Sequence, residues 1–153
     1  MGMACPYDED HYRQEALEAH NNKRGLHNCS PLKLNEKLCK IAKKCANKIS
    51  NGDSFIGNFY EGKILGENIS IFKDIHLDPK EICEEWYNEK EKYDRENPKY
   101  QNNTGHFTQM IWKETKEIGF GFNKNKGTYY VVVYYYPPGN TLGEFQENVT
   151  FPN

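Results

Sequence analysis

The feature that most constrains the fold is an unbroken run of aromatic and valine residues from Tyr129 to Tyr136. Such residues favour β-strands. The run does not alternate with polar residues, so a strand made from it must be covered on both faces. Pro137 and Pro138 follow directly and end it, because proline cannot donate a ladder hydrogen bond. The run therefore predicts a central strand between two apolar layers.

A second strand is predicted just before this run. Residues Glu117 to Phe122 have strand character, and Asn123 to Gly127 have the composition of a hairpin turn. The two strands would therefore pair in antiparallel fashion. Since helical patterns fill the first half of the chain, the expected class is α+β, with helices packed on both sides of an antiparallel sheet.

Three helices are expected from apolar spacing and capping residues. The first runs from Asp10 to Arg24, and Gly25 ends it. The second has Asn35 as its N-cap and ends at Asn51. The third has Asp78 as its N-cap, with a proline at the first helical position.

One charged residue breaks the pattern of the third helix. Ile82, Trp86, Glu89 and Tyr93 fall on one stripe at helical spacing, so Glu89 lies among apolar neighbours. It either lies at the edge of the stripe and extends to solvent, or it is a buried carboxylate with a partner, because unpaired buried acids are costly. Periodicity leaves both interpretations open.

The segment from Gly105 to Trp112 places His106 between a glycine and a block of aromatic and apolar residues. Histidine titrates near neutral pH. A single such residue is usually structural, bonded to a backbone carbonyl, unless other polar residues converge on it. A short helical turn is expected here.

Residues 53–77 show no clear period. Phe55, Phe59 and Tyr60 are separated by glycines, which favours a folded loop over a regular element. Long loops inside compact domains are often functional. The aromatic part, residues 53–65, could form an apolar surface.

Composition excludes some classes of function. The net charge is −2, with 37% hydrophobic and 14% aromatic residues, so the chain lacks the basic excess of a nucleic-acid-binding domain and is too aromatic to be disordered. No apolar run approaches the ~20 residues of a membrane span. Residues 1–153 are expected to form a single domain, with residues 1–7 a flexible N-terminus or a cloning remnant.

Cysteines and glycosylation motifs point to different compartments. The cysteine count is five, so at least one thiol is unpaired within the chain, and free thiols favour a reducing compartment. Asn-x-Ser/Thr motifs matter only in a secreted chain. They begin at Asn28, Asn68, Asn102 and Asn148. Secretion therefore remains an alternative.

Several motifs together resemble one known family. They are His20-Asn21 with Arg24, Gly66-Glu67-Asn68, Trp86-Tyr87-Asn88-Glu89, the stretch from Gly105 to Trp112, and Tyr134 to Asn140. In this order they are similar to the CAP superfamily, which includes cysteine-rich secretory proteins, insect venom allergens and plant pathogenesis-related proteins of group one. The resemblance covers about residues 8–151. It implies a three-layer α-β-α sandwich around a central antiparallel sheet.

The resemblance also implies a central cleft. Glu67, Glu89 and His106 match family residues that face it. The family has a further histidine, expected near Ile56, and this sequence has none there. No cofactor is therefore required, although His106 with the two carboxylates could hold zinc weakly. Structural roles near the cleft are implied for His20, Arg24, Asn68 and Gln109.

For function, the resemblance implies a non-enzymatic module that binds lipids or sterols, or another protein. Phe55, Phe59 and Tyr60 are the lipid-binding candidates. The chain is most similar to the Golgi-associated and venom-allergen-like members without disulfides. This implies an intracellular protein, peripheral on endomembranes, with an acidic membrane surface and a second copy as partners. The alternatives are a metal-assisted hydrolase that uses the cleft and a secreted immunomodulator.

Overall fold

The computed structural model describes residues 8–53, 59–74 and 76–152. The expected position of the missing family histidine, near Ile56, lies outside the described residues. So do Phe55 and the N-terminal segment 1–7.

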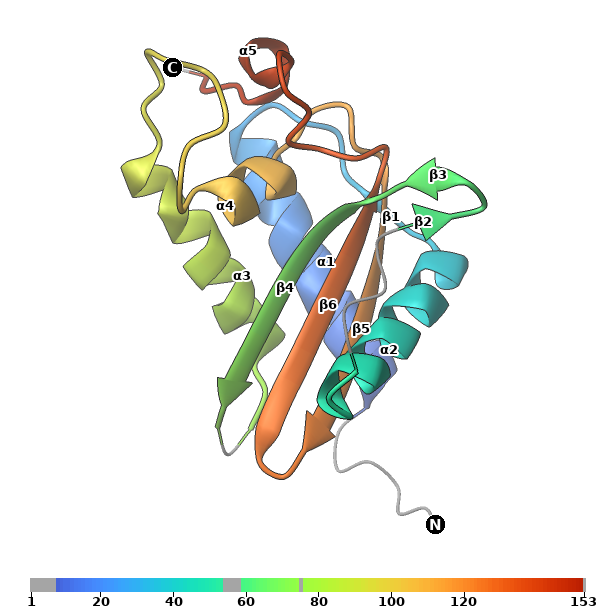
Figure 1. Ribbon diagram of the computed structural model, residues 1–153. Coiled ribbons are helices and arrows are strands. Elements are labelled where there is room, and N and C mark those ends of the chain that lie inside the picture. Colours follow the sequence, from blue (N-terminus) through green and yellow to red (C-terminus); the bar gives the residue numbers. More distant parts are fainter. Residues whose placement is uncertain (1–7, 54–58, 75, 153) are drawn as a thin grey trace.

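A four-stranded sheet forms the centre of the molecule, in the order β1-β5-β6-β4 (Figure 1). β6 (Thr128–Tyr136) pairs antiparallel with β5 (Glu117–Asn125) on one side and with β4 (Gly66–Lys73) on the other. β1 (Lys33–Leu34) adds a short parallel pairing to β5. The aromatic run is therefore an interior strand, as predicted.

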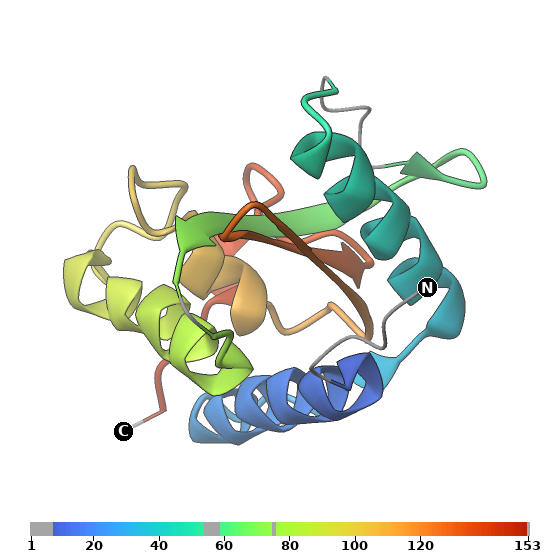
Figure 2. The same ribbon diagram turned by 90° about the horizontal axis from the view of Figure 1, so that it is seen from below.

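Helices cover both faces of this sheet, which confirms the α-β-α sandwich (Figure 2). α2 (Glu36–Ser50) packs on one face, against Val132 and Tyr134 of β6. The other face is covered by α1 (Glu9–Leu26), α3 (Pro79–Tyr87) and α4 (Gly105–Met110).

The alternation of the strands sorts their residues between the two layers. Val131, Val133 and Tyr135 belong to the core under α1, α3 and α4, whereas Val132 and Tyr134 belong to the core under α2. This explains why the run has no polar positions: both of its faces are buried.

α2 lies very close to β5 because β5 presents glycines to it. A Cβ atom added at Gly119 would collide with the backbone of Leu38, and one added at Gly121 would collide with the backbone of Ala42. The opposite face of β5 carries the phenylalanines Phe120 and Phe122. The strand thus joins one closely packed layer to one thick aromatic layer.

The two N-cap predictions are confirmed. Asn35 Oδ1 accepts hydrogen bonds from the first turn of α2, and Asp78 Oδ1 does the same for α3. The hairpin between β5 and β6 turns at Lys126 and Gly127, with φ angles of 53° and 81°. Two left-handed residues in a two-residue loop match the twist of the strands that it joins.

Three predictions of local structure were wrong. Gly25 does not end α1, which continues to Leu26, because Gly25 keeps helical φ and the left-handed residue comes later, at Asn28. The segment after residue 58 is not a loop: β2 (Phe59–Tyr60) and β3 (Lys63–Ile64) form a small hairpin, and β4 follows.

The third error concerns the end of the third helix. α3 stops at Tyr87 and continues as a 3₁₀ turn, η1 (Asn88–Lys92). Glu89 therefore does not lie on an α-helical stripe with Trp86. Two short elements were also not anticipated, β1 and the final helical turn α5 (Phe145–Asn148).

Candidate functional site

The centre of the site is a carboxylate–imidazole pair. Glu89 reaches from η1 to α4, where its Oε2 lies 2.7 Å from Nδ1 of His106. Its Oε1 accepts a hydrogen bond of 3.0 Å from the backbone N–H of Phe107. Both carboxylate oxygens are therefore used, and one of them satisfies a backbone donor at the start of α4, where Thr104 offers no side-chain cap. Of the two readings of Glu89, the structure shows the partnered one.

This pair defines which nitrogen of His106 faces the solvent. A carboxylate can only accept, so Nδ1 carries the proton and donates it to Glu89. When the ring is neutral, Nε2 is then able to accept a hydrogen bond. The ring stacks on Trp86 at a centroid distance of 5.3 Å and an interplanar angle of 11°. His106 is thus held in place on two sides, and its side chain is 39% exposed.

Glu67 reaches the same region from the edge strand. In the ladder it lies opposite Tyr134, so the two side chains share the face of the sheet that α2 covers. Burial raises the pKa of Glu67 to about 7, although a hydrogen bond from Tyr134 opposes this shift. Within the described part of the chain, Oε2 of Glu67 is buried without a hydrogen-bond partner. The carboxyl of Glu67 therefore keeps a substantial protonated fraction near pH 7, where an ordinary glutamate is ionised.

The three predicted cleft residues line one hollow of about 330 Å³. Its other walls are polar or small. They are Asn68, Tyr100, Asn103, Gly105 and Asn140. The structure therefore brings Glu67, Glu89 and His106 together on one open polar cleft, at the end of the sheet where β4 begins.

A chain of hydrogen bonds runs from α1 to this cleft through the core. His20 Nδ1 lies 2.8 Å from the carbonyl of Ala16, so it donates, and Nε2 accepts from the hydroxyl of Tyr135 at 2.7 Å. Asn68 then donates to the Tyr135 oxygen at 3.0 Å and to the carbonyl of His106 at 3.2 Å. Burial lowers the pKa of His20 to about 4, so this ring stays neutral and the direction of the chain is fixed.

Arg24 is fully buried, and no carboxylate of the described residues pairs with its guanidinium. Its guanidinium donates to four backbone carbonyls at 2.8–3.1 Å. They belong to Ser30, Met110, Trp112 and Thr115. Because one of these carbonyls follows α1 and the others lie at or after the last residue of α4, the cation links the end of α1 to the C-terminal end of the helix that carries His106. Carbonyl oxygens at a helix C-terminus carry partial negative charge, which suits a cation.

Gln109 fills the space between two backbone segments. Its Oε1 accepts from the N–H of Gly139 at 2.8 Å, and its Nε2 donates to Thr115 at 3.2 Å. A Cβ at Gly66 or at Gly139 would collide with this side chain. The closing segment after β6 is therefore held against the first residue of β4 through Gln109.

The β2–β3 hairpin carries an exposed apolar pair beside the cleft. Phe59 and Ile64 are directly paired in the ladder, and they are 62% and 57% exposed. Tyr60 instead packs against the core under α2. A groove of about 530 Å³ runs between Ile64 and Thr141, and Leu142, next in the chain, is 80% exposed. Sequence reasoning identified Phe59 but not Ile64 or Leu142.

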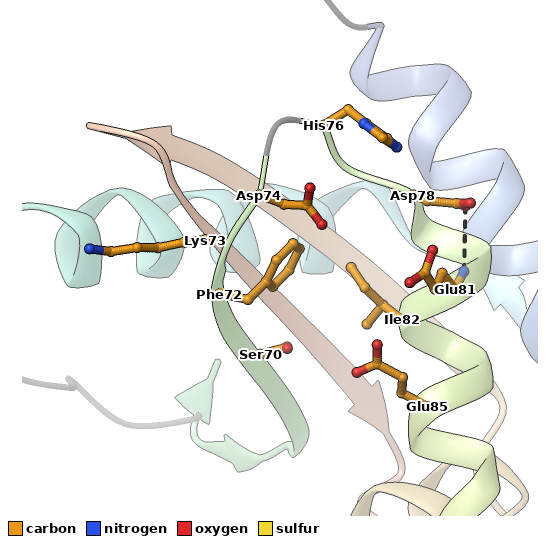
Figure 3. A pocket seen from close by; sticks show the side chains of 9 residues that line it. All are labelled: Ser70, Phe72, Lys73, Asp74, His76, Asp78, Glu81, Ile82 and Glu85. Carbon is orange, nitrogen blue, oxygen red and sulfur yellow. Dashed lines mark hydrogen bonds between the residues drawn. The ribbon is translucent and has the colours of Figure 1, made fainter.

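A second hollow, of about 200 Å³, lies between the end of β4 and the first turns of α3 (Figure 3). Four of its nine lining residues are acidic, namely Asp74, Asp78, Glu81 and Glu85, and Lys73 and His76 also line it. Acids are favourable at a helix N-terminus, and Asp78 accepts hydrogen bonds from that turn. The cap and the helix dipole account for Asp78 and Glu81. A cluster of acids alone does not identify a ligand, so we assign none to this hollow.

The resemblance allows a weakly held zinc ion at His106 with the two carboxylates. In residues 8–53, 59–74 and 76–152, no group of three or more His, Cys, Asp or Glu residues is arranged to hold a metal ion. Nδ1 of His106 is already engaged by Glu89. Among the described residues, the side chains at the cleft therefore do not form the closed set of four ligands of a structural zinc site. The described helices also include none that is long and apolar enough to span a membrane.

These features define the class of protein: an α-β-α sandwich with a polar His/Glu cleft at one end of the sheet. The family model of the cysteine-rich secretory proteins, CAP, matches residues 17–136. The chain belongs to this family.

Two relatives are similar to the chain in sequence, and one solved structure shares its fold. The human Golgi-associated plant pathogenesis-related protein 1 is 34% identical over 92% of this chain and 94% of that protein. Venom allergen 5.02 of Dolichovespula maculata is 34% identical over 76% of this chain and 59% of that protein. The crystal structure of NaASP2 with Zn²⁺ shares the fold at a TM-score of 0.70 and 24% identity, covering 98% of this chain and 91% of that one.

Proposed function

We propose that this protein is a non-enzymatic CAP module that binds a lipid or sterol through the β2–β3 hairpin. The observation that carries this proposal is the paired exposure of Phe59 and Ile64 on the hairpin. Single exposed apolar residues need no explanation, but adjacent ones at the rim of a groove are typical of a binding surface. Leu142, which follows Thr141 on the opposite wall, extends this surface.

The hairpin also carries a cation between its apolar residues. Lys63 precedes Ile64, and its ammonium lies 5.3 Å from the ring centroid of Tyr136. Amphipathic surfaces of this kind bind the boundary between lipid headgroups and acyl chains, and a lysine favours anionic headgroups. The proposal therefore includes an acidic membrane surface as partner, with a peripheral, intracellular location on endomembranes. A second copy of the chain is a further proposed partner.

A non-enzymatic function is supported by the described cleft residues, because none of them is a side-chain nucleophile activated by His106. In the described part of the chain, no hydroxyl or thiol donates a hydrogen bond to the His106 ring. Thr108, two residues away, has a single O–H, and the shortest contact of that hydroxyl is to the acceptor Oδ1 of Asn140, at 2.6 Å. A nucleophile needs an adjacent base in reach. On this proposal, the Glu89–His106 pair serves mainly to hold η1 against α4.

The test is a titration of the full chain with fluorescent sterol and with vesicles that contain acidic phospholipid. Saturable binding is expected for the wild type, and Phe59→Ser should weaken it about tenfold, which corresponds to losing the burial of much of one large apolar side chain. Ile71→Ser is the matched control, because Ile71 is 53% exposed but lies toward the other end of β4. An absence of saturable binding, or equal losses in both variants, would contradict the proposal.

A hydrolase is the second candidate, and the 2.7 Å contact of Glu89 with His106 favours it. A carboxylate-held imidazole is a competent general base, and an acid with a pKa of about 7, such as Glu67, could donate a proton at working pH. Ester or peptide hydrolysis that is lost in His106→Ala, with unchanged lipid binding, would establish this candidate instead.

A further inference from the structure

The four glycosylation motifs divide into two classes once the fold is known. Asn28 and Asn102 lie exposed in loops. Asn68 and Asn148 are 2% and 0% exposed. The sequence gives all four the same Asn-x-Ser/Thr pattern, so only the tertiary structure distinguishes them.

The two buried asparagines use both hydrogens of their side-chain amide. Asn68 Nδ2 donates to the His106 carbonyl and to the Tyr135 hydroxyl. Asn148 Nδ2 donates to the Glu144 carbonyl at 2.9 Å and to Oε1 of Glu114 at 3.4 Å, while its Oδ1 accepts from the N–H of Glu114 at 2.9 Å. Both hydrogens of each side-chain amide are therefore bonded, and neither side chain has room for an attached group.

N-glycosylation would act on this same nitrogen. A glycan is transferred from a lipid pyrophosphate donor: the bond between the sugar's anomeric carbon and the phosphate oxygen breaks, a bond to Nδ2 forms, and a proton leaves the amide. One of the two hydrogen bonds is then lost, and a bulky hydrophilic group must occupy a site with no solvent access. For Asn68, the loss falls between Tyr135 and the backbone of His106, at the wall of the cleft.

The cysteines provide an independent observation. The four cysteines in the described part of the chain, Cys29, Cys39, Cys45 and Cys83, are all buried and unpaired. Cys29 donates to the carbonyl of Ile111 at 3.2 Å and Cys39 accepts from the N–H of Phe120 at 3.4 Å, so these thiols are integrated in the core as thiols. Free buried thiols are typical of proteins that fold under reducing conditions.

We propose that N-glycosylation at Asn68 or Asn148 excludes the native state, so that this protein completes its folding in a reducing compartment where no glycan is transferred. Transfer in the secretory pathway takes place on the unfolded chain, before burial can protect the amide. Asn28 and Asn102 are the two motifs at which the folded chain tolerates a glycan. This inference does not depend on which ligand the hairpin or the cleft binds.

The test directs the full chain into the endoplasmic reticulum behind a cleavable signal sequence. We expect glycans at Asn68 or Asn148 by mass spectrometry, and retained, protease-sensitive protein. The double variant Ser70→Ala/Thr150→Ala removes both buried motifs but keeps both asparagines, and it should raise the yield of protease-resistant, exported protein several-fold. Asn28→Gln/Asn102→Gln, which removes the exposed motifs, should not.

Each variant is also expressed in the cytosol, where all of them should be equally protease-resistant. This control separates an effect of the glycan from an effect of the substitution, including the loss of the hydrogen bond from Thr150 to the carbonyl of His27. Export of native wild-type protein, whether its buried asparagines carry glycans or not, overturns the proposal. Equal retention of the wild type and the Ser70→Ala/Thr150→Ala variant overturns it as well.

Discussion

Several side chains in this protein bind two separate partners at once, and Glu89 is the clearest example. It fixes the tautomer of His106 with one oxygen and satisfies the N–H of Phe107 with the other. The guanidinium of Arg24 likewise donates hydrogen bonds to carbonyls in two separate segments. Such residues couple the cleft to the fold, so their substitution should change local chemistry and stability together.

Glu89→Gln should change the tautomer of the His106 ring. The amide oxygen can still accept from Phe107, but the amide nitrogen then faces Nδ1, which must become an acceptor. The ring proton therefore moves to Nε2. Nitrogen chemical shifts of His106 in NMR report the tautomer directly. The free energy of unfolding should fall by about 1–3 kcal/mol, because a charge-assisted hydrogen bond is lost.

The control for this variant is Glu91→Gln, in the same 3₁₀ turn, where the side chain is 79% exposed. It should change neither the tautomer nor the stability by more than about 0.5 kcal/mol. An unchanged Nδ1–H signal in Glu89→Gln would contradict the hydrogen-bond assignment.

At the scale of elements, the contact of α2 with β5 decides how thin one layer of the sandwich can be. The glycines of β5 give the helix backbone direct access to the strand. Sequence patterns predicted both elements but did not predict that their backbones are in contact. The residues that pack against a glycine can lie far from it in the chain, so the local sequence does not identify them.

Gly121→Ala should therefore destabilise the protein by about 3 kcal/mol or more, since the added methyl group must displace the backbone of Ala42. Gly25→Ala is the matched control. Nothing lies within 4 Å of a Cβ at Gly25, which is helical, so this change should leave stability unchanged or raise it by about 0.5–1 kcal/mol. Urea unfolding measures both, and similar values for the two variants would contradict the close packing.

At the scale of the whole molecule, the cleft lies where the two layers meet the end of the sheet. Glu67 faces the α2 layer, with Tyr134, whereas the next residue, Asn68, faces the α4 layer, with Tyr135. Ionisation of Glu67 therefore affects the packing between the two layers, and we expect it to change the free energy of unfolding of the whole domain.

The pH dependence follows from the raised pKa of Glu67. Between pH 4.5 and about 7 the native state binds more protons at this residue than the unfolded state does, so the free energy of unfolding falls as the pH rises. Glu67→Gln mimics the protonated acid. At pH 8 it should be more stable than the wild type by about 1 kcal/mol, a value reduced from the full linkage energy because the carboxyl is partly solvated.

At pH 4 the Glu67→Gln variant and the wild type should have the same stability. Glu147→Gln, at an exposed position in the last helical turn, serves as control and should not alter the pH profile of unfolding. A Glu67→Gln variant that is less stable at pH 8 would show that the carboxylate, not the neutral acid, is the native form.

The sequence by itself determined the features that depend on neighbours in the chain. The aromatic run of β6, the caps at Asn35 and Asp78 and the turn before Thr128 are local, and all are present in the structure. The motifs around Glu67, Glu89 and His106 identified the residues of the cleft. Their grouping followed from the resemblance rather than from periodicity, since Glu89 lies in a 3₁₀ turn and not on the predicted stripe.

Only the tertiary structure decided what depends on partners far apart in sequence. β4 was not predicted because its polar residues, Glu67 and Asn68, do not alternate with apolar ones as an edge strand should. They are tolerated because Tyr134 and Tyr135, some 67 positions further along, supply their hydrogen-bond partners. In the same way, burial and not sequence sets Asn68 and Asn148 apart from Asn28 and Asn102, because solvent access is a property of the assembled layers.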